Sequence, residues 1–240
     1  MNIVSFSGGK DSTAMLFMML EKGIHIDRVI CVDTTKEFPE MYRHIEKVQA
    51  MIEPLKIEII KIDFDYFFAD KEIMRGPNKG KFGYGWTGAR GRWCTKLKVD
   101  AINKITKKII DAVEFVGIAY DEVERTEKKY IKEKNVRLPL VEWQITGKQA
   151  LDYCYSKGLD WDGLYEKMNR VSCWYCPLSR IGSLRTLYND FQDLWRKLEE
   201  MDKKSWRNFK SNYSVSDLTE RFANENLIKS QEQASILVCQ

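Results

Sequence analysis

The stretch Asn2–Ser12 reads Asn-Ile-Val-Ser-Phe-Ser-Gly-Gly-Lys-Asp-Ser, and it decides the fold. Its apolar first part, Asn2–Phe6, predicts a buried strand that ends at a Gly-Gly turn. Apolar residues at helical spacing follow over Lys10–Lys22, and Gly23 ends that predicted helix. A strand, a glycine turn and a helix in this order indicate the first half of a β-α-β unit.

The same alternation continues along the chain and predicts an α/β fold with a Rossmann-like parallel sheet flanked by helices. Further strands are expected at Arg28–Asp33, Ile57–Ile62 and Ala112–Gly117, and further helices at Glu40–Ile52, Lys96–Lys108 and Thr146–Lys157. From Ser183 to Leu227 the chain is polar and helix-rich, and we expect Trp195, Leu198 and Trp206 to be its buried anchors. We therefore predict a nucleotide-binding domain over residues 1–180 and a helical C-terminal extension over residues 181–240.

Composition narrows the functional class before any motif is considered. The chain has 240 residues with 44% hydrophobic and 31% charged side chains, which is typical of a globular protein. Its longest apolar stretch near the start, Ala14–Leu20, is far too short to span a bilayer. No basic leader with a small-residue cleavage site is present at the N-terminus, so we expect a cytoplasmic protein without a membrane partner.

The Gly-Gly turn predicts a phosphate-binding loop. Two glycines let successive backbone N–H groups point into one concavity, and the following helix adds the positive end of its dipole. Lys10 and the two serine hydroxyls add direct donors, and Asp11 can position Mg²⁺ or cap the helix. The alternative is a plain turn with an ordinary helix cap, which needs one of these residues rather than all of them. The predicted loop residues are Ser7, Gly8, Gly9, Lys10, Asp11 and Ser12.

Polar residues follow two of the predicted strands, at the edge where ligands bind in open parallel sheets. Asp33 and Thr34 end the second strand, and Gly117 ends the strand Ala112–Gly117. Glu122 and Arg125 follow Gly117 closely, so that Arg125 can neutralise a phosphate. The alternative is a charged helix face in which Arg125 pairs with Asp121, four residues earlier. The predicted nucleotide contacts outside the loop are Asp33, Thr34, Gly117, Glu122 and Arg125.

A basic segment lies between the third and fourth strands. From Arg75 to Lys98 there are seven Lys or Arg residues and no Asp or Glu, and Arg75–Arg92 is rich in glycine. We predict a functional loop rather than a linker. Its cations can hold a nucleic acid, although they also suffice for one nucleotide. The predicted substrate-phosphate ligands are Arg90, Arg92, Lys96 and Lys98.

The six cysteines suggest a metal or redox site, because structural disulfides are rare in a reducing cytosol. Cys94 lies among four cations, which favour a thiolate, and Cys173 and Cys176 form a Cys-x-x-Cys-Pro element. Cys154 is an alternative fourth ligand, which would also suit a four-cysteine zinc site. Three unconnected thiols are the remaining interpretation, and Cys31 lies in an apolar strand that predicts a core position.

Ser-Gly-Gly-Lys-Asp-Ser resembles the pyrophosphate loop of the adenine nucleotide α-hydrolase-like superfamily, whose fold is the HUP type of parallel sheet. In that superfamily the loop holds the phosphates of ATP or of a sulfonucleotide. Val32–Tyr42 resembles the Asp-Thr-Gly…Phe-Pro-Glu-Thr-Tyr segment of phosphoadenosine phosphosulfate reductases, with Thr35 in place of the glycine. Gly117–Arg125 and Pro139–Cys173 resemble later segments of the same family, so that the likeness covers about residues 1–180.

This resemblance implies an adenine-nucleotide enzyme with Mg²⁺ and a [4Fe–4S] cluster. Cluster-bearing reductases hold the cluster with a Cys-Cys pair and a Cys-x-x-Cys pair, and here Trp93 replaces the first cysteine. The matching ligands Cys94, Cys173 and Cys176 would leave one iron open to sulfide, as proposed for cluster-dependent tRNA thiolation enzymes. Arg92–Lys98 also resembles part of the DNA phosphorothioation enzymes. The predicted catalytic residues are Lys10, Asp11 and Arg92.

Three functions follow as hypotheses from these residues. The first is ATP-dependent adenylation followed by sulfur transfer, with sulfide supplied by a donor protein such as a cysteine desulfurase. The second is reduction of adenylyl sulfate or its 3′-phosphorylated form, in which Cys239 or a partner's cysteine attacks the sulfur. Cys239 lacks the Glu-Cys-Gly-Leu-His motif that surrounds the reductase nucleophile. The third is a nucleotide-sensing subunit without catalysis.

Overall fold

The computed structural model describes residues 1–88, 91–127, 135–168 and 170–238. Two compact units, each assembled from two separate segments, make up the chain. Unit 1 contains residues 1–62 and 95–167, and unit 2 contains residues 63–94 and 168–240. The sequence-based boundary at residue 180 stays a prediction.

Unit 1 is built on a five-stranded sheet in the order β3-β2-β1-β4-β5. Every adjacent pair of strands is parallel, and Val4 of β1 aligns with Val29 of β2 and Phe115 of β4. The predicted Rossmann-like parallel sheet is therefore confirmed. The strands are β1 (Asn2–Ser5), β2 (Arg28–Asp33), β3 (Ile57–Lys61), β4 (Val113–Val116) and β5 (Val136–Arg137).

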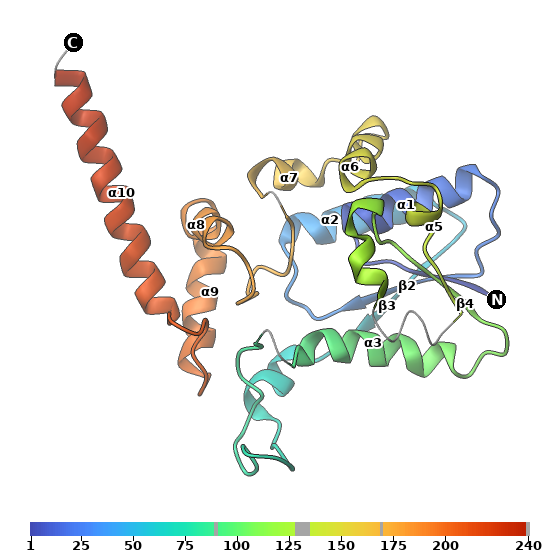
Figure 1. Ribbon diagram of the computed structural model, residues 1–240, viewed down its shortest axis with the longest axis horizontal. Coiled ribbons are helices and arrows are strands. Elements are labelled where there is room, and N and C mark those ends of the chain that lie inside the picture. The colour runs from blue at the N-terminus through green and yellow to red at the C-terminus, as the bar shows by residue number, and fades with distance from the viewer. Residues whose placement is uncertain (89–90, 128–134, 169, 239–240) are drawn as a thin grey trace. The chain divides into compact units, whose positions relative to one another are not determined.

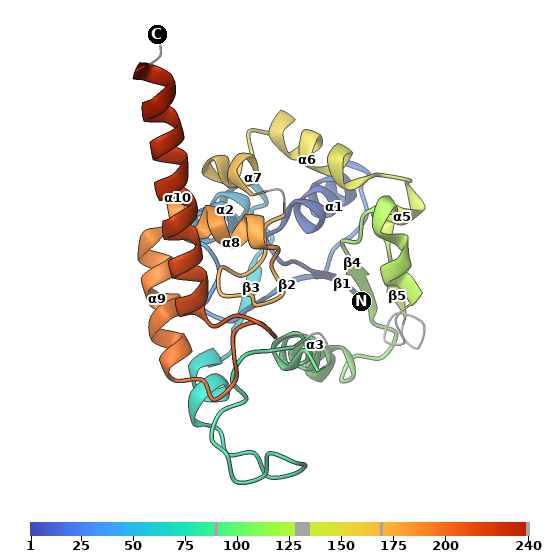
Figure 2. The same ribbon diagram turned by 60° about the vertical axis from the view of Figure 1, so that its left-hand side comes forward.

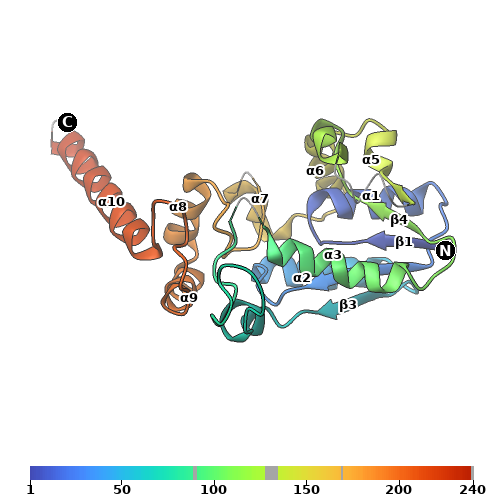
Figure 3. The same ribbon diagram turned by 60° about the horizontal axis from the view of Figure 1, so that its bottom comes forward.

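Helices cover both faces of this sheet. Figure 1 shows α1 and α2 on one side of the strands and α3 on the other, and Figure 3 shows α1 and α3 on opposite sides of β1. The described helices of unit 1 are α1 (Lys10–Glu21), α2 (Pro39–Met51), α5 (Pro139–Glu142), α6 (Gly147–Ser156), α7 (Leu164–Lys167) and, from Thr95 onward, α3 (Trp93–Thr106). Its described part also contains two short 3₁₀ segments, η2 (Tyr120–Glu127) and η3 (Trp161–Gly163).

Apolar side chains of the central strands and of α1 form the core of unit 1. Ile3, Val4 and Val29 are fully buried, as are Met15 and Leu16 of α1. Because both faces of a parallel sheet are covered, its strands are apolar throughout instead of alternating. The predicted core position of Cys31 is confirmed, and burial raises the pKa of its thiol to about 12.

Unit 2 combines a short π-helical turn, η1 (Tyr66–Asp70), with three helices that lie side by side in Figure 2. They are α8 (Ile181–Asp190), α9 (Gln192–Lys203) and α10 (Val215–Val238). Trp195 and Leu198 are buried as predicted, and the Trp195 ring lies 5.7 Å from that of Phe222. The prediction for Trp206 is wrong, because 37% of that residue is exposed. Within the described residues, no helix is long and apolar enough to cross a membrane.

Candidate phosphate site

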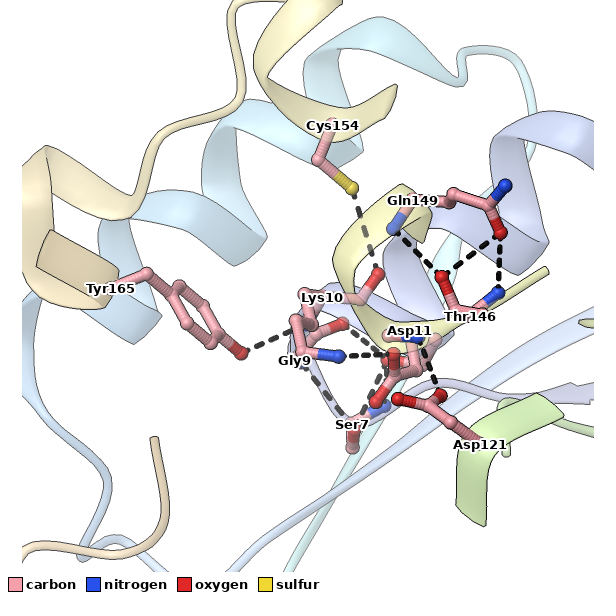
Figure 4. A network of polar contacts seen from close by, with 11 residues as sticks. Ser7, Gly9, Lys10, Asp11, Asp121, Thr146, Gln149, Cys154 and Tyr165 are labelled. Atoms are coloured by element: carbon pink, nitrogen blue, oxygen red, sulfur yellow. Dashed lines mark hydrogen bonds and ion pairs between the residues drawn. The ribbon is translucent and has the colours of Figure 1, made fainter. Parts of the chain in front are cut away.

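The Gly-Gly turn lies between the end of β1 and the start of α1, where Figure 4 shows its polar contacts. Gly8 has a φ of +76°, in the left-handed region that other residues rarely adopt. A Cβ atom on Gly8 would also approach Met41 Sδ of α2 to 2.8 Å. Backbone conformation and space thus both require glycine at this position.

Two serine hydroxyls close the loop on itself. Ser7 Oγ lies 3.0 Å from Ser12 Oγ, and Ser12 Oγ donates to the carbonyl oxygen of Gly9 at 3.0 Å. The backbone N–H of Ser7 donates to Ser12 Oγ at 3.2 Å. These contacts hold the loop against the first turn of α1, whose dipole favours an anion at this end.

The Lys10 amine and the Asp11 carboxylate form an ion pair at the mouth of the loop. Lys10 Nζ lies 2.6 Å from Asp11 Oδ1, and only 22% and 21% of the two side chains are exposed. The amine also lies against the N-terminus of α6, because a Cβ on Gly147 would approach Lys10 Nζ to 2.5 Å. Gly147 in turn donates its N–H to Asp121 Oδ1 at 2.7 Å.

A buried wall behind the loop consists of His44, Thr13 and Trp161. The His44 ring stacks on Trp161 with centroids 4.0 Å apart, and its Nε2 lies 3.0 Å from Thr13 Oγ1. Trp161 Nε1 donates to the carbonyl oxygen of Gly8 at 2.8 Å. Burial, reinforced by the nearby Lys47 charge, lowers the pKa of His44 to about 3, so that the ring is neutral at pH 7.

Tyr165 and Cys154 contact the loop residue Lys10 through its backbone. The N–H of Lys10 donates to the Tyr165 hydroxyl at 3.0 Å, and the Cys154 thiol donates to the Lys10 carbonyl oxygen at 3.6 Å. Burial raises the pKa of Cys154 to about 12. A metal ligand must be a thiolate, so this environment favours a structural role for Cys154 over the predicted alternative of a fourth ligand.

Gly117 and Asp33 lie at the carboxyl ends of the two strands that flank β1. A Cβ on Gly117 would lie 2.7 Å from both the Cα and the backbone N of Ser12, so that only glycine fits here without displacement. Asp33 Oδ1 accepts hydrogen bonds from the Thr35 N–H at 2.6 Å and from the Tyr42 hydroxyl at 2.9 Å. The buried Thr34 Oγ1 has no hydrogen-bond partner among the described residues.

Thr35 adopts a φ of +60°, a left-handed conformation that glycine adopts without strain. The Asp33 carboxylate holds this turn through the N–H of Thr35. Glu122 lies in η2 at a non-helical φ of −110°. Arg125 also falls in η2, but its side chain lies outside the described part of the chain.

The predicted phosphate ligands of the basic segment are divided between the two units. Arg92 and Lys96 are exposed, and Arg90 lies outside the described residues. Lys98 Nζ binds Glu37 Oε1 at 2.8 Å. Arg92 belongs to unit 2 and the two lysines to unit 1, so their role in holding a substrate stays a prediction.

A family model for the phosphoadenosine phosphosulfate reductase domain matches residues 1–179. The chain belongs to the phosphoadenosine phosphosulfate reductase domain family. The glycine-rich loop, Asp33 and Gly117 all lie within the matched residues. The sequence-based assignment to this family is thereby confirmed.

Two individual proteins are also similar to this chain. An uncharacterized protein of Methanocaldococcus jannaschii is 30% identical over 211 residues, which is 83% of this chain and 41% of that protein. The chain thus spans less than half the length of this curated relative. The U34-tRNA thiolase NcsA from Methanococcus maripaludis, solved with its [4Fe-4S] cluster, is 15% identical with a TM-score of 0.47. That alignment covers 95% of this chain and 71% of NcsA.

The predicted cluster ligands of this reductase-domain protein all lie in unit 2. Trp93, beside Cys94, and Tyr175, between Cys173 and Cys176, pack on the same Phe64 ring at centroid distances of 5.0 and 4.4 Å. The two cysteine-bearing segments therefore share one support. Among the described residues, however, no three Cys, His, Asp or Glu side chains are arranged to hold a metal. The ligand set stays a prediction, and Cys239 lies outside the described residues.

Sequence reasoning missed the residues that support the loop from behind. His44, Trp161 and Tyr165 contact it from α2, η3 and α7, more than thirty residues away in the chain. No local pattern links an aromatic residue at position 161 to a glycine at position 8. Gly147 was also missed, because its importance comes from the space that Lys10 occupies.

Proposed function

We propose that this protein is an ATP-dependent enzyme that activates an acceptor oxygen as an adenylate and replaces it with sulfur. The observation that carries the proposal is the meeting of three segments around the Gly-Gly turn of unit 1. Asp33 and Gly117 come from the two strands that flank β1, and Gly117 approaches the first turn of α1. In open parallel sheets, ligands bind at such a place, outside the carboxyl ends of the strands.

The loop has the chemistry to hold a polyphosphate. Its glycine backbone, the dipole of α1 and the Lys10 amine are attractive to an anion. Asp11 adds the carboxylate oxygen that Mg²⁺ prefers. In the proposed reaction the acceptor oxygen attacks the α-phosphorus of ATP, and the α–β bridging oxygen leaves with pyrophosphate. Lys10 and the loop amides would stabilise the negative charge that develops on this leaving group.

Sulfur transfer would then complete the exchange. Sulfide attacks the acceptor carbon, the carbon–oxygen bond breaks, and AMP leaves with the former acceptor oxygen. The residues proposed to hold a [4Fe–4S] cluster are Cys94, Cys173 and Cys176, and their donor chemistry fits because thiolates are the usual cluster ligands. Such a cluster would supply a bound sulfide to the reaction. Lys210 fixes the turn after Cys176 by donating to the carbonyl oxygens of Pro177 and Ser179 at 2.6 and 2.7 Å.

Calorimetric titration of anaerobically purified protein tests the nucleotide assignment. ATP–Mg, adenylyl sulfate and 3′-phosphoadenylyl sulfate are titrated separately. We expect ATP–Mg to bind at least tenfold more tightly than either sulfonucleotide. The reverse preference would replace the proposal with sulfonucleotide reduction, and Cys239→Ser should then abolish turnover.

A matched pair of lysine variants tests the loop itself. Lys10→Met should weaken ATP–Mg binding by about 10- to 150-fold, the range expected for one charge-assisted hydrogen bond. Lys148→Met is the control, because Lys148 lies on α6 with 84% of its side chain exposed and pairs with Asp152. Equal affinities of the two variants would exclude the loop as the phosphate site. Binding of ATP without release of pyrophosphate, even when candidate acceptors are present, would instead favour a nucleotide sensor.

A further inference from the structure

Unit 2 contains a pocket whose lining includes no residue of the phosphate loop. Its volume is about 210 Å³. This is smaller than the roughly 300–1,000 Å³ of sites that enclose a whole drug-sized ligand. Its lining includes Arg75, Tyr84, Trp93, Trp206 and Arg207.

Backbone hydrogen bonds fold the segment that forms one wall of this pocket. Glu72 and Phe82 form an antiparallel bridge, and Ile73 exchanges backbone hydrogen bonds of 2.9 Å with Lys81 and Gly80. The N–H of Tyr84 donates to the carbonyl oxygen of Phe67 at 2.9 Å, which ties the segment to η1. The glycine-rich stretch is therefore a structured support in its described part.

Both pocket tryptophans use their ring nitrogen to bind this segment. Trp206 Nε1 donates to the carbonyl oxygen of Gly83 at 2.9 Å, and Trp93 Nε1 donates to that of Gly85 at 3.0 Å. Their polar atoms are thus satisfied, while the rings line the pocket. Trp93 lies 5.5 Å from the Tyr84 ring at an interplanar angle of 50°. Trp206, which was predicted to be a buried anchor, is therefore partly exposed, with its ring held in a defined orientation.

Cations lie close to the Trp206 ring. Lys81 Nζ lies 4.2 Å from the Trp206 ring centroid, and the Arg207 guanidinium carbon lies 5.0 Å from it. Arg75 adds a second guanidinium to the lining, which contains no carboxylate among the described residues. Lys79 and Lys81 lie on the same segment of unit 2 but outside the lining, so the positive charge extends beyond the pocket.

We propose that this pocket takes one unstacked base of a single-stranded nucleic acid, with the flanking phosphates on the surrounding cations. Aromatic faces and a positive surface are the combination that binds single strands with little sequence preference. The volume fits a single ring system rather than a whole nucleotide, and the charge extends past it, which favours a strand over a free mononucleotide. Bases in a duplex are stacked and cannot enter. A single-stranded nucleic acid would then be the acceptor in the sulfur transfer proposed above. This acceptor role rests on the proposed function, whereas binding of the strand does not.

Fluorescence anisotropy with labelled 12-nucleotide single strands tests the proposal on the full chain without ATP. We expect saturable binding of single-stranded RNA or DNA, and at least tenfold weaker binding of a duplex of the same sequence. Trp206→Ala should weaken single-strand binding by about 5- to 150-fold, the range given by one base stacked on an aromatic ring. Parallel RNA and DNA strands identify which nucleic acid is preferred.

Variants at charged residues provide a second test of the pocket in case Trp206→Ala does not fold. Arg75→Ala changes an exposed side chain and should weaken binding while reducing the slope of log Kd against log salt by about one. Arg196→Ala on α9 is the control, because Arg196 is 70% exposed and does not line the pocket, and we expect less than a twofold change. Equal losses in both variants, equal binding of duplex, or displacement by AMP at similar concentrations would overturn the proposal.

One further variant separates this proposal from the proposed function. Lys10→Met should bind the single strand as the wild type does, although it loses ATP affinity. If the protein binds the single strand but not ATP, the pocket assignment is retained and the proposed adenylation is refuted. If it binds ATP and releases pyrophosphate but binds no single strand, the proposed adenylation is retained and the pocket assignment is refuted.

Discussion

Replacing Gly117 by alanine tests whether the strand end after β4 positions the phosphate loop. The added Cβ would lie 2.7 Å from the Cα and the backbone N of Ser12, whereas ordinary contacts of this kind begin at 3.4 Å. Both contacted atoms belong to the backbone of α1, so no side-chain rotation relieves the clash. Overpacking of this kind typically costs about 1–3 kcal/mol. We therefore expect the free energy of unfolding to fall by about that amount.

The same displacement should weaken nucleotide binding, because Ser12 closes the loop through Ser7 and Gly9. We expect the Kd for ATP–Mg to rise at least tenfold. Urea unfolding and calorimetry measure the two effects on the same preparation. Gly182→Ala in α8 is the control, since nothing lies within 4 Å of its added Cβ and alanine favours a helix. Unchanged stability and affinity of Gly117→Ala would refute the reasoning.

Three further predictions concern neighbouring residues. Thr35→Gly should raise the free energy of unfolding by about 0.5–1 kcal/mol in urea denaturation, because glycine adopts the φ of +60° without strain; a fall would contradict this. Gly147→Ala should displace the Lys10 amine and lower ATP affinity severalfold by calorimetry, while stability stays within about 0.5 kcal/mol, because a flexible side chain moves. The pKa of His44, about 3 when folded, lies below its unfolded value, so the unfolded state binds more protons as the pH falls. Lowering the pH from 7 to 5 should therefore cost the wild type about 2 kcal/mol more than His44→Gln in urea unfolding, and equal losses would contradict this.

The sequence predicts the parallel sheet well because the relevant signals are local. The strand Arg28–Asp33 was predicted with the bounds that β2 has, since Val29 to Val32 form an uninterrupted apolar run. The predicted helix Thr146–Lys157 begins with a capping box between Thr146 and Gln149. Strand β5, by contrast, has only two residues and gives no periodic signal. Helix α3 begins at Trp93 rather than at Lys96, and its first turn carries Cys94.

The residues around the loop could not be predicted because their signals are not local. An exposed and a buried tryptophan look alike in a sequence, and Trp206 was assigned to the core for this reason. Its ring nitrogen instead binds the backbone of Gly83, more than a hundred residues earlier. His44 carries no sequence signal that connects it with the loop. Its contact with Thr13 depends on how α2 packs against α1, which no spacing rule reveals.

Burial makes the support behind the loop electrically neutral, so the charges at the mouth of the loop come from Lys10, Asp11 and the nearby Asp121. The pKa of His44 is lowered and those of Cys154 and Tyr165 are raised, so all three are uncharged at pH 7. These residues position the backbone without adding to the field at the phosphate. The ion pair at the mouth then has to open for a polyphosphate, because one amine cannot fully serve both anions. Mg²⁺ offers Asp11 a replacement partner while Lys10 turns to phosphate, so in the proposed enzyme the metal and the nucleotide would bind as one unit.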